Sequence, residues 1–387
     1  MTKKYYGILP NIIVPLGGFG TDIYVPSMPA MVAEFNASRS EVQLTMTAYV
    51  AAMGFGQLLA GPISDALGRK KLILISLVIQ TLTVIGIILS PSIYWVIFNR
   101  FLQGLAAAFM IVPGRAILND CFSDDELKKQ FNYLTISFAL APIIAPLIGG
   151  ICQEYFGWQA SFYFILFYAV ILLILVSLTY EETIPAKKKF KPSDIFHNYV
   201  HIFSDRKFVM MTLFVSILFG FSSLTSVLGP FIFVKHLGVA PLHYGYIALF
   251  FGFGWFCGNV TNRIFFLVQP ISKLRFSLIC HFLTTLVLLG SSLTGIYSLI
   301  PTITAFFLYI YAAGLVFPLM VGEGLALFPT LAASSNACLF ASTWIVFAIY
   351  TGVATFIPLN NLIILSLVFL GINLASILLY QDIKKNF

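Results

Sequence analysis

Charged side chains inside apolar sequence are the residues of this chain most able to do chemistry. Asp22 is the only charged residue in the run NIIVPLGGFGTDIYVPSMPAMV. A carboxylate at the centre of an apolar helix costs about 2.5–3.5 kcal/mol, which predicts a functional role. Burial disfavours the charged form of a carboxyl group, so we expect Asp22 to exchange a proton or to bind substrate. The alternative is a structural cap for backbone groups freed near Pro26 and Pro29.

Polar and aromatic residues are expected around Asp22. Arg100 lies in another apolar run and stays charged, so it needs a partner, for which Asp22 is the first choice. Alternatively, Arg100 extends to the membrane edge and reaches water. Gln103 is a candidate polar contact in the same cavity. Tyr24 and Tyr49 are expected to line that cavity, where aromatic rings favour lipophilic or cationic substrates.

Two further charged residues lie toward the ends of apolar runs. Arg115 follows Arg100 by fifteen residues, which places both on roughly the same side of a helix. Glu323, in PLMVGEGLALFP, is the acid found in the apolar sequence of the second half. Glu323 is either a second proton-coupling acid or a glutamate exposed to water at a helix end.

The elements that must position these residues are membrane-spanning helices. Hydrophobic residues make up 59% of the 387 residues and charged residues only 10%, too few to cover a soluble protein of this size. Apolar runs of about 20 residues predict transmembrane helices. Twelve are predicted, centred near Gly20, Ala52, Ile79, Ala107, Ile143, Phe167, Phe219, Phe253, Leu286, Ala312, Ile345 and Leu370.

Basic residues predict the orientation. All but four of the 22 lysines and arginines fall on one side of the predicted membrane, which places both termini in the cytoplasm. The longest polar stretch, 181–207, then forms a cytoplasmic linker. The predicted fold is an all-α integral membrane protein with two six-helix bundles, residues 1–180 and 208–387, a plan typical of transporters with a site between the halves.

Several function classes are disfavoured. The net charge of +7 is spread in short basic clusters between apolar runs, so nucleic acid is not an expected partner, whereas membrane lipid is. The five cysteines form no CxxC pair, and no metal-ligand spacing occurs among the histidines. No constellation of His, Asp, Ser or Cys suggests catalysis. We therefore expect no metal, no cofactor and no enzymatic activity.

Four motifs occur in a recognisable order. TDIYVPSMPAM is followed by GPISDALGRKK (61–71), by NRFLQGLAAAFMIVPGRAILND (99–120) and by LAPIIAPLIGG (140–150). Together they resemble the major facilitator superfamily, and within it the Bcr/CflA-type branch of drug:proton antiporters. The resemblance is continuous from about residue 20 to 182 and weaker beyond. The chain departs from the family pattern at Ala66, Gln159 and Asn262.

The resemblance implies roles for particular residues. It assigns proton coupling to Arg100 together with Asp22. It also implies a cytoplasmic gate latched by a charge relay, and an exporter motif in the fifth span. The gate residues are Gly61, Asp65, Gly68, Arg69, Arg115 and Asp120, and the exporter motif residues are Pro142, Pro146, Gly149 and Gly150.

The expected function is proton-driven export of small amphipathic or cationic molecules by alternating access, in the bacterial cytoplasmic membrane. The proton gradient is the driving force. Two alternatives stay open: export of an endogenous metabolite such as a siderophore, and uptake by proton symport. One chain holds a complete pathway, so a monomer is expected to suffice.

Overall fold

A computed structural model describes residues 3–184, 187, 189–294, 299–359 and 363–386. Lys188, predicted to belong to the basic linker, lies outside these residues. The described chain is helical almost throughout and contains no strand. This confirms the predicted all-α fold.

The first half of the chain forms eight helices and one 3-10 turn. We call α1–α8 the first bundle. Its elements are α1 (Lys3–Ile13), α2 (Pro15–Asp22), η1 (Val25–Ser27), α3 (Met28–Glu34), α4 (Arg39–Leu67), α5 (Arg69–Ile88), α6 (Ile93–Cys121), α7 (Asp124–Phe156) and α8 (Gln159–Thr179).

The second half repeats this design after a short helix. We call α10–α15 the second bundle. Its elements, preceded by α9 (Pro192–Ser204), are α10 (Arg206–Pro230), η2 (Phe231–His236), α11 (Pro241–Ile264), α12 (Pro270–Leu293), α13 (Leu299–Ala326), η3 (Pro329–Leu331), α14 (Ala332–Ala354) and α15 (Ile363–Asn386).

Eleven helical segments of the described chain are long and apolar enough to cross a membrane. They match eleven of the twelve predicted spans. The remaining one, centred on Phe253, is α11. Its 24 residues extend about 36 Å at 1.5 Å per residue, which suffices to cross, but they include His243, Asn259 and Arg263 and are therefore more polar.

The first span is broken rather than continuous. It extends over Tyr5–Glu34 but consists of α1, α2, η1 and α3 in succession. Pro15 starts α2, while Pro26 and Pro29 follow the break; proline removes a backbone donor and clashes with the preceding turn. Asp22 is the last residue before the break.

Local sequence signals determine where other helices begin. Ser38 and Glu41 form a capping box at the start of α4, because each side chain binds the other's backbone N–H. Asp205 accepts a hydrogen bond from the Phe208 amide at the start of α10. Gly68 separates α4 from α5 with a φ of +103°, a conformation that favours glycine.

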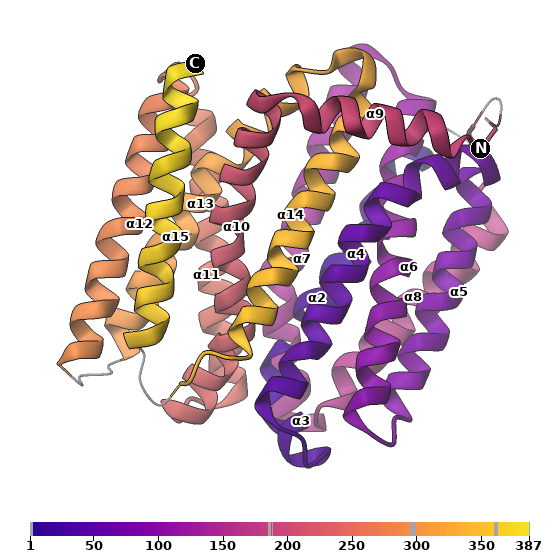
Figure 1. Cartoon of the computed structure of the whole chain (residues 1–387). Helices are drawn as coiled ribbons and strands as arrows, with labels where there is room; N and C mark the ends of the chain where they lie inside the picture. Colours follow the sequence, from indigo (N-terminus) through magenta and orange to yellow (C-terminus); the bar gives the residue numbers. More distant parts are fainter. Residues whose placement is uncertain (1–2, 185–186, 188, 295–298, 360–362, 387) are drawn as a thin grey trace.

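The two bundles lie side by side and meet along two helix pairs (Figure 1). α4 packs against α14, and α7 packs against α11. Both ends of the chain lie at the same end of the molecule, where α9 crosses over the two bundles. We call this end the terminal face; α3 lies at the opposite face.

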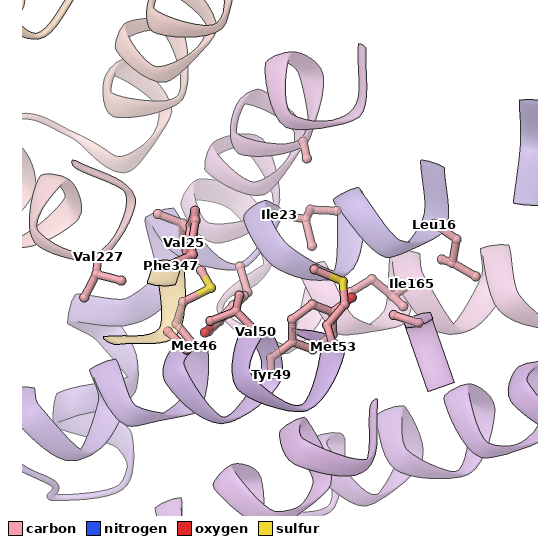
Figure 2. Packing of buried hydrophobic residues seen from close by; sticks show 14 of the residues in the cluster. Leu16, Ile23, Val25, Met46, Tyr49, Val50, Met53, Ile165, Val227 and Phe347 are labelled. Carbon is pink, nitrogen blue, oxygen red and sulfur yellow. The ribbon is translucent and has the colours of Figure 1, made fainter. Parts of the chain in front are cut away.

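Apolar side chains from both bundles form a common core near α4 (Figure 2). Val25, Met46 and Tyr49 of the first bundle are fully or almost fully buried and belong to the same cluster as Val227 of α10 and Phe347 of α14. This core supports the break in the first span from the second-bundle side.

Candidate functional site

Asp22 lies at the break in the first span. Its side chain is half-buried, and no described residue forms a hydrogen bond or an ion pair with it. The two following short helices have no side-chain cap, so Asp22 does not act as the structural cap that was the alternative expectation. A carboxylate at a helix C-terminus also faces the negative end of the helix dipole. Within the described part of the chain, Asp22 thus has no hydrogen-bond or ion-pair partner.

Arg100 is fully buried beside this break. Its guanidinium carbon lies 4.4 Å from the centroid of the Tyr24 ring and 4.1 Å from that of Tyr49. Nη1 donates to the carbonyl of Gly20 at 2.7 Å and to Oε1 of Gln103 at 2.7 Å. The guanidinium therefore lies over both tyrosine rings while it donates two hydrogen bonds, a combination that suits the planar group of arginine. Arg100 does not extend to the membrane edge.

The structure brings the candidate cavity residues together in a buried cluster. The Tyr49 hydroxyl donates to the Gly17 carbonyl at 2.8 Å, and the Tyr24 hydroxyl lies 2.9 Å from that of Thr45. Tyr24, Tyr49 and Gln103 have no exposed surface. In this conformation they form a wall behind Asp22 and are not themselves open to solvent.

Asp22 and Arg100 are neighbours without direct contact. The Arg100 charge acts on Asp22, but no ion pair joins them within 4.0 Å. Nε and Nη2 of Arg100 are buried without any hydrogen-bond partner in the described structure. A buried arginine donor left unpaired is costly, so these two atoms can accommodate a carboxylate.

Residues of the predicted exporter motif in α7 pack against the break in the first span. A Cβ atom on Gly149 would lie 1.7 Å from the carbonyl oxygen of Ile23, so only glycine allows α7 to approach so closely. The same carbonyl, freed by the break, accepts a hydrogen bond from Ser161 at 3.3 Å. Gly150 faces the second bundle, where a Cβ atom would lie 2.7 Å from the Pro241 carbonyl.

Proline does not interrupt α7. The helix continues through Pro142 and Pro146 from Asp124 to Phe156. Pro142 lies near the Cβ position of Gly18 in α2, whereas the Pro146 carbonyl lies 3.0 Å from the Cβ position of Gly245 in α11. The motif therefore contacts the first span on one side and the second bundle on the other.

A charge network lies at the terminal face. Arg69 Nη1 donates to Asp65 Oδ1 at 2.6 Å, and Nε donates to Asp120 Oδ2 at 3.1 Å. These three predicted gate residues come from α5, α4 and α6 of the first bundle. Through these contacts the network joins helix ends of the first bundle. Gly61, also predicted there, lies in α4 with its Cβ position 4.0 Å from Val112.

Glu182 is a member of this network that the sequence reasoning missed. Its carboxylate accepts hydrogen bonds from the backbone amides of Arg69 at 3.0 Å and Lys70 at 3.2 Å, and so caps α5. It also lies beside the Cβ position of Gly68, whose φ of +103° favours glycine. The acids of YEETI after the sixth span were the only available signal.

Arg115 and Glu323 lie apart from the network. Arg115 contacts Phe138 of α7 and Phe340 of α14, not Asp120. Glu323 is half-buried near the end of α13, without a hydrogen bond or ion pair in the part of the chain described. In the second bundle, Lys273 donates to Asn262 Oδ1 at 2.9 Å. Among the described residues no cluster of three or more His, Cys, Asp or Glu side chains offers a metal site.

Comparison with known proteins identifies the family. The model of the Major Facilitator Superfamily matches residues 12–344, most of the chain. The chain belongs to this superfamily. It is therefore an integral membrane transporter and not an enzyme, as predicted.

Curated relatives agree with the predicted branch. This major facilitator is 32% identical over 316 residues to the "Uncharacterized MFS-type transporter YdgK" of Bacillus subtilis, covering 80% of this chain and 78% of that one. It is 30% identical to the "Bicyclomycin resistance protein homolog" of Haemophilus influenzae, over 66% and 63% of the two chains. It is 26% identical to "Multidrug resistance protein D" of Escherichia coli, over 84% and 82%.

Solved structures share the fold at low identity. A D-xylose-proton symporter superposes with a TM-score of 0.75 at 12% identity, covering 98% of this major facilitator and 97% of that chain. A peptide transporter, POT, in complex with sulfate superposes with a TM-score of 0.77 at 12% identity, covering 99% and 94%. At this identity the likeness concerns the fold alone.

Proposed function

We propose that this major facilitator is a proton-coupled exporter of small drug-like molecules, with Asp22 as its proton site. The observation that carries the proposal is the Asp22 carboxyl, half-buried at a break in the first span and without a partner, beside an arginine with two unpaired donors. The names of the bicyclomycin and multidrug resistance relatives support small drug-like substrates.

The transport cycle follows from competition for Asp22. With Asp22 ionised, its charge attracts a cationic substrate from the cytoplasm or the inner leaflet. After the two bundles rock about their interface, a proton from outside neutralises Asp22 and the substrate leaves. The protonated carrier then returns and releases the proton inside. The proton gradient supplies the energy, so the proposed cycle needs no cofactor.

The proposed orientation places the terminal face in the cytoplasm of a bacterial cell. Basic residues at that face, including Lys70 and Lys191, support this orientation because positive loops stay inside. We further propose that residues 1–180 and 208–387 are the two moving units, and that one chain suffices for transport. Anionic lipid at the inner surface is the expected contact of the basic linker.

Replacing Asp22 tests the proton role. Purified protein is reconstituted in proteoliposomes, and ethidium movement is followed after an imposed pH gradient. Asp22→Asn keeps the side-chain shape but cannot ionise, so we expect gradient-driven ethidium transport to fall to the level of protein-free vesicles. Counterflow exchange of ethidium without a gradient needs no proton release, so it is expected to fall less than gradient-driven transport, by the amount that the lost attraction between Asp22 and ethidium costs.

Glu34 offers the matched control. It belongs to the same span but lies exposed at the end of α3, and Glu34→Gln is expected to leave transport unchanged. Gradient-driven transport by Asp22→Asn at the wild-type rate would contradict the assignment of Asp22.

A further inference from the structure

Arg115 is a second arginine at the interior that the proposed proton cycle does not use. Its guanidinium carbon lies 5.5 Å from the centroid of the Phe138 ring in α7 and 4.7 Å from that of Phe340 in α14. The two rings belong to different bundles. Arg115 therefore lies at the interface where the bundles meet, and all three side chains are half-buried.

The donors of Arg115 are free to bind a ligand. A cation–π contact places the guanidinium over the face of an aromatic ring and does not use its N–H groups as hydrogen-bond donors. No described residue forms an ion pair or hydrogen bond with Arg115. Buried side-chain nitrogens without a partner include two of Arg100 but none of Arg115. The Arg115 donors therefore reach space that water can enter.

This position is separate from the proton site. Arg115 lies fifteen residues beyond Arg100 in α6, about 22 Å along the helix and nearer the terminal face. The polar pair formed by Ser137, which donates to Asn11 Oδ1 at 3.1 Å, adjoins Phe138 in sequence. A ligand entering from the terminal face reaches Arg115 before it reaches Asp22.

We propose that Arg115 recognises the carboxylate of planar aromatic substrates at the interface between the bundles. A guanidinium binds a carboxylate through two parallel hydrogen bonds, and no acid of the described protein already occupies this one. Phe138 and Phe340 add apolar contact for the aromatic part of the ligand. The inference rests on the proposed export function and adds aromatic acids and zwitterions to its cationic substrates.

Two dyes that differ in one group test the inference. Rhodamine 110 carries a free carboxylate, whereas rhodamine 123 is its methyl ester and only cationic. Binding is measured by fluorescence polarisation with protein in phosphatidylcholine nanodiscs, which contain no anionic headgroup to compete. We expect Arg115→Gln to weaken rhodamine 110 binding about tenfold or more and rhodamine 123 binding less than about twofold. Arg115→Lys keeps the charge and is expected to retain part of the difference.

Arg263 provides the control for a lost positive charge. It is exposed at the end of α11, and Arg263→Gln is expected to leave the binding of both dyes unchanged. Retained rhodamine 123 binding shows that Arg115→Gln is folded. If Arg115→Gln weakened the binding of both dyes equally, Arg115 would only be a contact between the bundles, and the inference would be wrong. Unchanged rhodamine 110 binding would also overturn the inference. Wild-type protein that binds rhodamine 123 but shows no Asp22-dependent transport of it contradicts the export function instead.

Discussion

The partners of Arg100 in the structure differ from those expected from the sequence. In the sequence Arg100 is an isolated charge that needs a partner, and Asp22 was the expected one. In the structure two tyrosine rings and two acceptors hold it, and Asp22 lies close but unbound. Under the proposed function the pair acts as a switch, in which the two unpaired donors of Arg100 bind the Asp22 carboxylate in another conformation.

Replacing this arginine by lysine tests the stacked arrangement. An ammonium group lacks the planar fork of donors with which Arg100 lies over Tyr24 and Tyr49 and donates to Gly20 and Gln103, so Arg100→Lys is expected to lower the free energy of unfolding by about 1–2 kcal/mol. Thermal unfolding in detergent measures the change. Arg263→Lys, at an exposed site, is the control and is expected to leave the unfolding temperature unchanged.

Gly149 is the second position where a single residue decides the packing. Gly149→Ala places a methyl group against the Ile23 carbonyl, so α7 must move away from the break, at a cost of about 1–3 kcal/mol. Gly290→Ala is the matched control, since its Cβ position meets nothing within 4 Å. There the better helix propensity of alanine is expected to stabilise the protein slightly. Equal unfolding temperatures for the two variants would contradict this reading of Gly149.

At the scale of elements, the linker is part of the first bundle's structure. Glu182 caps α5, while Thr183 donates to Asp120 Oδ2 at 3.1 Å. The charge network therefore holds the helix ends and the start of the linker as one unit. At the far end of the linker, α9 binds back to α4, because the Tyr199 hydroxyl donates to the Leu58 carbonyl at 2.7 Å.

Removing the Glu182 carboxylate is expected to loosen the start of the linker. Glu182→Ala deprives two amides at the N-terminus of α5 of their acceptor, a loss of about 1 kcal/mol for a helix cap. Limited proteolysis with trypsin should then cut faster near Lys187. Asp194→Ala, which removes an exposed ion pair with Lys191 and an exposed hydrogen bond from Ser193, should leave the rate unchanged. Equal cleavage of all three proteins would refute the role of Glu182.

At the scale of the whole molecule, polar contacts close the face opposite the termini. Arg39 Nη2 donates to the Ile357 carbonyl at 2.6 Å, and Ser40 donates to the Thr355 carbonyl at 2.8 Å. These carbonyls follow α14, so the start of α4 binds the end of a second-bundle helix. Further inward, Thr47 donates to Thr351 at 2.9 Å. The bundles are therefore held together on that side.

Arg39→Ala is expected to shift the protein toward a conformation open at this face. Asn36→Cys and Phe356→Cys are both exposed at this face, on opposite bundles, and can carry spin labels. Double electron–electron resonance then reports the opening as a longer distance between the two labels. The five native cysteines are first replaced by serine. Lys235→Ala removes an exposed charge from η2 at the end of α10 and serves as control. An unchanged distance distribution in Arg39→Ala would exclude Arg39 as a closing contact.

The sequence by itself determined the membrane class, the spans, the family and the identity of Asp22 as an anomalous acid. It could do so because apolar length and isolated charges are local properties that the bilayer constrains strongly. Even α11, which falls short of the apolar content of the other spans, was predicted as an apolar run centred near Phe253. Asp65, Arg69 and Asp120 of the charge network were expected from the resemblance to the family, whereas Glu182 was not.

Tertiary structure alone decided how these residues face one another. Asp22 ends a helix without capping the next, Arg100 lies over two tyrosine rings, and Arg115 contacts rings of both bundles. These arrangements depend on helix rotation and on contacts between residues far apart in the sequence. Such contacts leave no periodic signal in the chain. Asp22 was recognisable from its cost in an apolar run, but its lack of a partner became visible only once its neighbours were placed.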